Sequence, residues 1–106
     1  MTQQLLKQAM TVSQILRIYG KRFRQIQKKY SDGHTGRCAI GVIMSYYGWD
    51  GKESALESSE LLAALFALRY AGIGTDLIIH LNDSGMAFDE IADYLDQNHE
   101  SANSKS

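Results

Sequence analysis

The sequence contains no proline, only one cysteine and no long apolar run. Without proline, glycine and short polar stretches have to mark the breaks between elements. Cys38 has no partner for an intramolecular disulfide, and no Cys/His set has the spacing of metal ligands, so we expect a reducing compartment, no metal and no cofactor. No stretch approaches the roughly 18 consecutive apolar residues of a membrane span, and residues 1–20 lack the pattern of a signal peptide. These absences predict a soluble, cytoplasmic protein that does not bind membranes.

The length of 106 residues fits one domain, which is large enough to bury a core without disulfides or metals. From Gln97 onward the sequence is polar and carries no signal that would cap another element. We therefore expect residues 1–96 to form a single helical domain and residues 97–106 to form a flexible polar tail.

Apolar residues recur near the N-terminus at alternating spacings of four and three residues, which is the periodicity of one helix face. The members of this seam are Leu5, Ala9, Val12, Leu16, Tyr19, Phe23, Ile26 and Tyr30. The pattern predicts one long amphipathic helix, or two collinear helices with a kink at Gly20, where glycine costs up to about 1 kcal/mol relative to alanine. Its apolar face either lies across the rest of the fold or pairs with a second copy in a homodimer.

Two further segments are expected to be largely interior. Residues 37–49 are apolar nearly all round, which favours a central buried helix in which Gly41 lets another helix approach closely. Ser54 and Glu57 match a capping box, so we expect the next helix to begin there and to run to about Ala71. Its apolar face is wide, which is typical of a helix with little solvent contact.

Glycines also separate the last two predicted helices. Gly72 and Gly74 end the preceding helix, and Thr75 then caps a short one. A final helix from about Phe88 places its apolar residues inward and its carboxylates outward. Together these elements predict an all-α fold, a single-domain bundle of four to five helices with a long amphipathic N-terminal helix.

Two segments carry a resemblance to known proteins. Residues 36–43 read Gly-Arg-Cys-Ala-Ile-Gly-Val-Ile, and residues 79–95 contain a Leu-Asn-Asp-Ser-Gly turn followed by Phe-Asp-Glu-Ile-Ala-Asp. The chain resembles a loose group of small uncharacterised bacterial and bacteriophage helical proteins, in which a Gly-x-Cys-x-x-Gly helix precedes such a turn and helix. The resemblance implies an all-helical fold and a mobile-element or accessory-gene setting, and it implies no activity.

Cys38 is the candidate nucleophile of the chain. A thiol enzyme would need His34 or His80 close to the sulfur, because the thiolate requires a base or a positive environment at neutral pH. The residues that follow Cys38 are apolar and cysteine is among the most buried residue types, so a core cysteine is the favoured interpretation. No Ser-His-acid order, phosphate loop or zinc pattern is present in the sequence. We therefore expect no enzyme, and a thiol enzyme remains a third hypothesis.

The charges are divided unevenly along the chain. Residues 1–37 contain eight Lys and Arg against one acid, Asp32, whereas residues 38–106 contain three against eleven. Such a division serves the binding of an anionic partner, or it serves the fold or a head-to-tail dimer, because a basic helix attracts an acidic one at short range.

The densest basic stretch is the candidate functional site. Its cations are Lys21, Arg22, Arg24, Lys28 and Lys29. On a helix, four or five of them would face one phosphate backbone, whereas the aromatic residues between them belong to the apolar seam. The main hypothesis is a non-catalytic regulatory or accessory protein that binds another protein, or a second copy of itself, through this surface. The alternative is a nucleic-acid-binding regulator that uses the same cations to contact phosphates.

Overall fold

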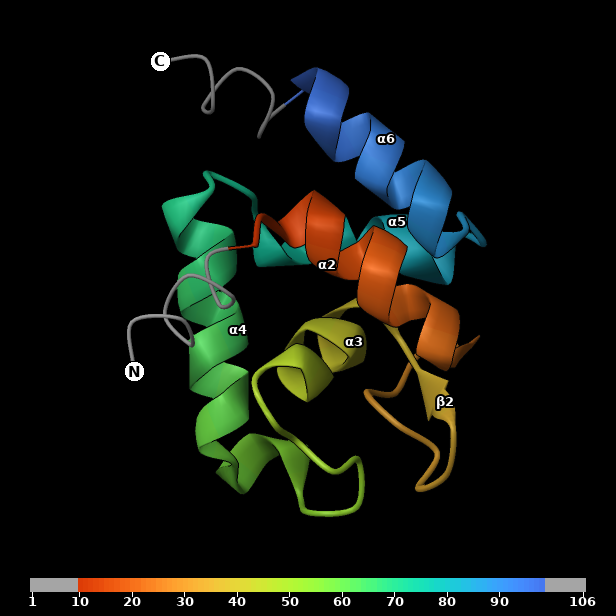
Figure 1. Ribbon diagram of the computed structural model, residues 1–106, viewed down its shortest axis with the longest axis vertical. Coiled ribbons are helices and arrows are strands. Elements are labelled where there is room, and N and C mark those ends of the chain that lie inside the picture. Colours follow the sequence, from red (N-terminus) through yellow and green to blue (C-terminus); the bar gives the residue numbers. More distant parts are fainter. Residues whose placement is uncertain (1–9, 99–106) are drawn as a thin grey trace.

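The computed structural model describes residues 10–98, which form a set of helices around a central one, α3 (Figure 1). The α-helices are α2 (Val12–Tyr19), α3 (Ala39–Tyr46), α4 (Ser59–Tyr70), α5 (Thr75–Asp83) and α6 (Phe88–Asn98). Two 3₁₀ turns, η1 (Gly20–Arg22) and η2 (Ala55–Glu57), and two short strands, β1 (Arg24–Gln25) and β2 (Gly36–Arg37), connect them. The strands pair in parallel. The prediction of a mostly helical fold is therefore confirmed, with a small sheet that the sequence did not predict.

The long N-terminal helix predicted from the seam is wrong within the described residues. Helix α2 begins after Thr11, whose side chain accepts the Gln14 backbone N–H at 3.2 Å while its own N–H donates to Gln14 Oε1 at 2.9 Å. It ends at Tyr19, and after one 3₁₀ turn Phe23 is extended, with φ −130° and ψ 151°. The seam members Leu5 and Ala9 lie outside the described residues.

A close contact explains why residue 20 is a glycine. A Cβ atom on Gly20 would lie only 2.9 Å from Phe88 Cδ2, so the approach of α6 depends on this glycine. The apolar spacing continues beyond Gly20 because Phe23 and Tyr30 pack against the core from an irregular segment. Residues at helical spacings therefore continue to contact the core after Gly20, although the backbone there is not helical.

Helix α3 is the buried centre that the sequence predicted. Its residues 39–44 are all buried, and Cys38 caps its N-terminus by accepting the Gly41 N–H at 3.4 Å. The close approach at Gly41 is made by a loop and not by another helix, since a Cβ atom there would lie 2.1 Å from the carbonyl oxygen of Tyr30.

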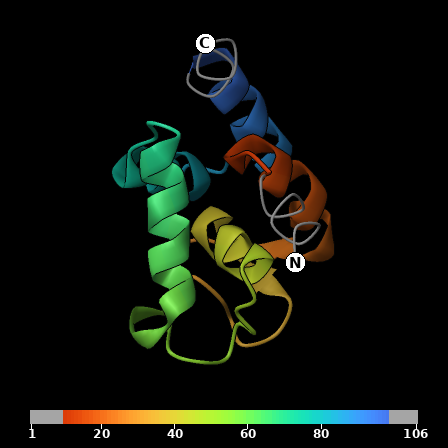
Figure 2. The ribbon, with the colours of Figure 1, turned by 60° about the vertical axis from the view of Figure 1, so that its left-hand side comes forward.

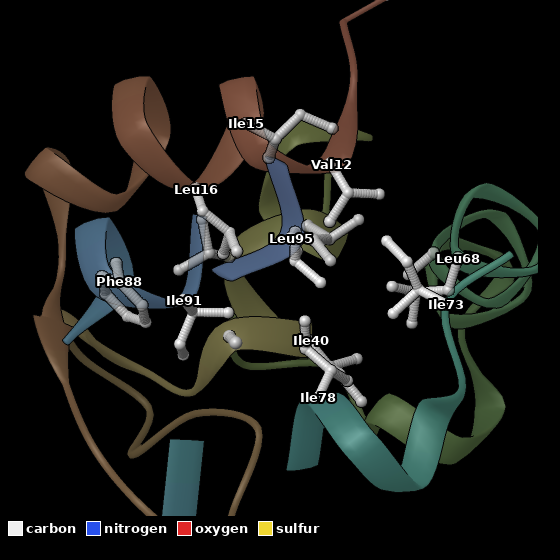
Figure 3. Close-up of a cluster of buried hydrophobic side chains, with 14 of the residues drawn as sticks. Val12, Ile15, Leu16, Ile40, Leu68, Ile73, Ile78, Phe88, Ile91 and Leu95 are labelled. Atoms are coloured by element: carbon white, nitrogen blue, oxygen red, sulfur yellow. The ribbon is translucent and has the colours of Figure 1, made fainter. Parts of the chain in front are cut away.

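One apolar core joins the helices (Figure 3). Its members include Val12, Ile15, Leu16, Ile40, Leu68, Ile73, Ile78, Phe88, Ile91 and Leu95. Helix α6 faces inward with its apolar residues, as predicted. The Arg17 guanidinium of α2 binds the carboxylates of Asp93 at 2.6 Å and Asp96 at 2.7 Å on α6. One basic residue of the N-terminal part is therefore paired with acidic residues of the same chain. Helix α6 runs to Asn98, and the rest of the predicted tail lies outside the described residues.

Helix α4 begins later than the capping box predicted. Ser58 is its N-cap and accepts the Leu61 N–H at 3.2 Å, whereas Ser54 precedes the 3₁₀ turn η2 and makes no side-chain cap. The capping box of Ser54 and Glu57 therefore predicts a helix start about one turn before the observed one. Ser58 supplies an equivalent hydroxyl nearer to the regular helix.

Candidate functional site

The predicted cations do not share a helix face. Lys21 and Arg22 lie on η1, Arg24 lies on β1, and Lys28 and Lys29 lie in the loop between the two strands. All five side chains are exposed. The prediction that these cations share one helix face is therefore wrong, because α2 ends at Tyr19. The role of the five cations in binding a partner stays a prediction.

Two of these cations interact within the chain. The Arg22 guanidinium lies 4.2 Å above the Tyr19 ring, and the Arg24 guanidinium pairs with the carboxylate of Asp32. The same carboxylate accepts the backbone N–H groups of His34 at 2.9 Å and Gly36 at 3.0 Å, and these bonds hold the pKa of Asp32 below its usual range. This end of the basic stretch is therefore partly neutralised by its own loop.

A buried amide fixes the first half of this segment, which we call the polar loop (residues 23–37). Asn82, at the end of α5, is 1% exposed. Its Oδ1 accepts the Gln25 side-chain amide at 2.9 Å and the Ala39 N–H at 3.0 Å, and its Nδ2 donates to the carbonyl of Ile26 at 2.9 Å. The Gln25 side chain also accepts the Phe88 N–H at 3.1 Å, which ties the loop to the start of α6.

A buried arginine fixes the second half of the polar loop. Arg37 is 4% exposed, and its guanidinium donates to Ser45 Oγ and Ser31 Oγ and to the carbonyls of His34, Gly36 and Asp50 at 2.8–3.3 Å. It also stacks 4.6 Å from the Phe23 ring. Burial lowers the pKa of Arg37. Because every acceptor is internal, Arg37 stabilises the loop and does not face a ligand.

Cys38 lines a pocket of about 230 Å³ between the polar loop and α5, together with Lys28, Ile78 and Asp83. The thiol is 8% exposed, and burial raises its pKa. The favoured interpretation of a core cysteine is therefore confirmed by its burial.

The histidines of the described residues lie at the surface. His34 is exposed in the turn of the polar loop, and His80 is exposed on α5. Across residues 10–98, no three His, Cys, Asp or Glu side chains gather closely enough to hold a metal ion.

Helix α4 presents large apolar side chains to solvent. Leu62, Phe66 and Tyr70 follow one another at spacings of four and are 59%, 66% and 94% exposed. We call these three side chains the outer face of α4. The opposite side, with Ala64 and Leu68, is fully buried against α3 and α5. Figures 1 and 2 both show α4 along one edge of the molecule, and Leu56, which is 78% exposed, lies just before its N-terminus.

The wide apolar face of α4 predicted a largely interior helix, and that prediction is wrong for its outer face. A helix that is apolar all round needs cover on two sides. The other described helices cover one side only, because α2 packs mainly against α6 and α3, and α6 packs mainly against α2 and α5. The apolar composition of α4 indicates that the helix needs cover on all sides, but it does not indicate whether that cover comes from the same chain.

No single helix among residues 10–98 has both the length and the apolar content to cross a membrane. Helices α4 and α5 meet those two criteria only together, and they are bent by 102° at their junction.

The chain matches no family model, no curated protein and no solved structure. The resemblance to small bacterial and bacteriophage helical proteins therefore stays a prediction.

Proposed function

We propose that this is a non-catalytic binding protein that associates with another protein through the outer face of α4. The observation that carries the proposal is the exposure of Leu62, Phe66 and Tyr70 on one side of a helix whose other side is part of the core. Contiguous apolar surface of this kind on a soluble domain is typical of a protein interface. Aromatic residues are also the side chains most often found at the energetic centre of such interfaces.

The proposal moves the contact surface away from the basic stretch. An interface centre is depleted in charge, and helix α4 contains only Glu60 and Arg69 as charged residues. The cations Lys21, Arg22, Arg24, Lys28 and Lys29 are spread over a turn, a strand and a loop. A regulatory or accessory role fits a small chain that offers one such surface.

The proposal is tested in the cell that makes the protein, with a tagged chain analysed by native size separation of the extract. We expect the tagged protein to migrate above the 11.9 kDa of one chain. The double variant Leu62→Ser/Phe66→Ser should return it to the position of a single folded chain. A matched double variant, Ile18→Ser/Ile79→Ser, changes exposed apolar residues on α2 and α5 and should leave the complex intact. A complex that survives the α4 variant would refute the proposal.

Nucleic-acid binding is the second candidate, supported by the exposure of Lys21, Arg22, Lys28 and Lys29 within nine residues. Phosphate contacts would make such binding fall steeply as salt rises. The proposed function predicts no binding of labelled DNA or RNA at physiological salt by fluorescence anisotropy. Micromolar binding that is lost in Lys28→Glu/Lys29→Glu but kept in Lys52→Glu would replace it with the second candidate.

A further inference from the structure

We infer that the outer face of α4 binds a second copy of this chain, with the two α4 helices antiparallel about a two-fold axis. The inference rests on the proposed function and names its partner. It follows from the order of side-chain sizes along the helix, from the area exposed and from the placement of charge.

The row formed by Ser59, Ala63, Phe66 and Tyr70 runs from small to large side chains along α4. Leu62 of the outer face lies beside this row, one position before Ala63. Residues at these spacings lie on one side of a helix with 3.6 residues per turn. An antiparallel axis between residues 64 and 65 would set Phe66 opposite Ala63 of the second copy and Tyr70 opposite Ser59.

Each of these large-to-small contacts would occur twice, because the same patch is used by both copies of a two-fold dimer. Close packing requires such interdigitation, in which a bulky side chain fills the space above a small one. A parallel pair in register would instead place Phe66 against Phe66 and leave Ala63 opposite Ala63. The size pattern of α4 is therefore self-complementary in the antiparallel arrangement.

The exposed area approaches what a specific dimer needs. Taking about 200 Å² for a fully exposed large side chain, the three side chains of the outer face of α4 together expose roughly 440 Å² at fractions of 59–94%. Two copies would then bury about 900 Å² from these side chains alone, close to the roughly 1,000 Å² that a specific interface exceeds. Neighbouring polar atoms at the rim add to this area.

The charges of α4 also fit an antiparallel second copy. Arg69 is the exposed cation beside the outer face, and no ion pair holds it within residues 10–98. In the antiparallel arrangement the two Arg69 positions are offset by about 14 Å along the helix axis, at 1.5 Å per residue. That offset exceeds the Debye length of about 8 Å at physiological salt, whereas a parallel pair would bring the two guanidinium groups side by side.

The same composition disfavours a membrane surface as the occupant. Amphipathic helices that lie on anionic lipid carry Lys and Arg along the polar border, and α4 contains no lysine and a single arginine.

The first test is sedimentation of the pure full-length chain from 1 to 500 µM. We expect the measured mass to rise with concentration towards twice the 11.9 kDa of one chain. Phe66→Glu should raise the dissociation constant at least 100-fold, because a carboxylate would be buried at two places in each dimer. Ile18→Glu is the matched control at an exposed apolar residue of α2 and should change the constant less than twofold. Equal weakening by both variants would overturn the inference.

The arrangement is tested by exchanging the sizes of two residues. Phe66→Ala should weaken the dimer by removing the large side chain, and Ala63→Phe should weaken it by overfilling the space opposite Phe66. The double variant Ala63→Phe/Phe66→Ala restores one large side chain opposite one small one, and we expect at least tenfold recovery over either single variant. Additive weakening in the double variant would exclude the antiparallel pairing.

The pure-protein test and the cell-extract test separate the inference from the proposed function. A chain that stays monomeric when pure but migrates in an α4-dependent complex in extract overturns the second-copy inference and keeps the proposed function. A chain that is monomeric in both overturns both.

Discussion

The polar loop and helix α4 both lie at the surface, but they use their side chains in opposite ways. In the polar loop the guanidinium of Arg37 and the side-chain amide of Gln25 are hydrogen-bonded within the chain, and Asn82 of α5 binds Gln25 and Ile26 of the loop. In α4 the apolar residues Leu62 and Phe66 contact solvent although the helix belongs to the core on its other side. The contrast shows that the polar groups that hold the loop have hydrogen-bond partners within the chain, whereas the apolar residues of the outer face of α4 remain exposed to solvent.

The physical basis of the contrast is what each group gains from a partner. The buried polar groups of the loop already have hydrogen bonds, so a ligand would have to replace them without net gain. The exposed side chains of α4 still have apolar area to remove from water, at about 25 cal/mol per Å². The following substitutions test whether the two regions differ in this way.

The largest effect is expected at the inner side of α4. Leu68→Ala should lower the free energy of unfolding by about 2–5 kcal/mol, because Leu68 is fully buried and its removal leaves a cavity. Leu62→Ala, the same change on the outer face, should alter it by less than about 0.5 kcal/mol. Urea unfolding measures the free energy for both variants, at low micromolar protein so that the fraction of associated chains is small. Equal losses would mean that the outer face is also covered within one chain.

The next effect is expected where the polar loop is closed. Asn82→Ala should cost about 2–3 kcal/mol, because the Ala39 N–H and the Ile26 carbonyl lose their buried partner. Asn98→Ala removes an exposed amide that bonds to Tyr94 and should cost less than about 0.5 kcal/mol. A small loss at Asn82, measured by the same urea unfolding, would show that the loop is not held as the structure indicates.

A smaller effect is expected from acid in the turn of the polar loop. The pKa of Asp32 is lowered by the backbone N–H of His34, so its charged form stabilises the folded chain. This contribution is fully present above the usual aspartate pKa of about 3.9 and is lost as pH falls through the lowered value. Asp32→Asn should therefore be less stable than the wild type at pH 5, and the difference should shrink by pH 2. Asp89→Asn, on α6, controls for the loss of one negative charge, and a difference that does not depend on pH would contradict the assignment.

The smallest effect on stability is expected from the cations that the sequence placed in the functional site. Lys28 and Lys29 are exposed, and the bond that Lys28 makes to Asp83 uses its backbone N–H at 3.0 Å and not its side chain. Lys28→Glu/Lys29→Glu should change the free energy of unfolding by less than about 0.5 kcal/mol and leave the α4-dependent complex intact. Loss of that complex would return the contact surface to the basic stretch.

Helices α3 and α6 were predictable from the sequence. Helix α6 has its apolar residues on one side, and α3 is apolar nearly all round at the centre, so pattern and burial agree in both. The helix predicted from the apolar seam is wrong after Tyr19, because residues that reach the core from a loop can have a helical spacing by chance. The hydrogen bonds of Asn82 to the polar loop and the close contact of Gly20 with Phe88 join residues more than 50 positions apart, so a local pattern does not reveal them.

The candidate site was only partly predictable for a related reason. The pattern of α4 indicates that it needs apolar cover, but the sequence does not state whether the cover comes from the same chain. That depends on how the remaining helices are arranged, which is set by packing between distant segments such as α2 and α6. Arg37 was likewise missed, since its burial depends on acceptors from separate segments.

The most direct test of the central claim is site-specific photo-crosslinking in the cell that makes the protein. A photo-reactive residue is placed at position 66 on the outer face of α4 or, in a second variant, at position 28 in the polar loop. We expect discrete protein adducts from position 66 and none from position 28. Adducts from position 28 alone, to protein or to nucleic acid, would contradict the claim that α4 carries the binding surface.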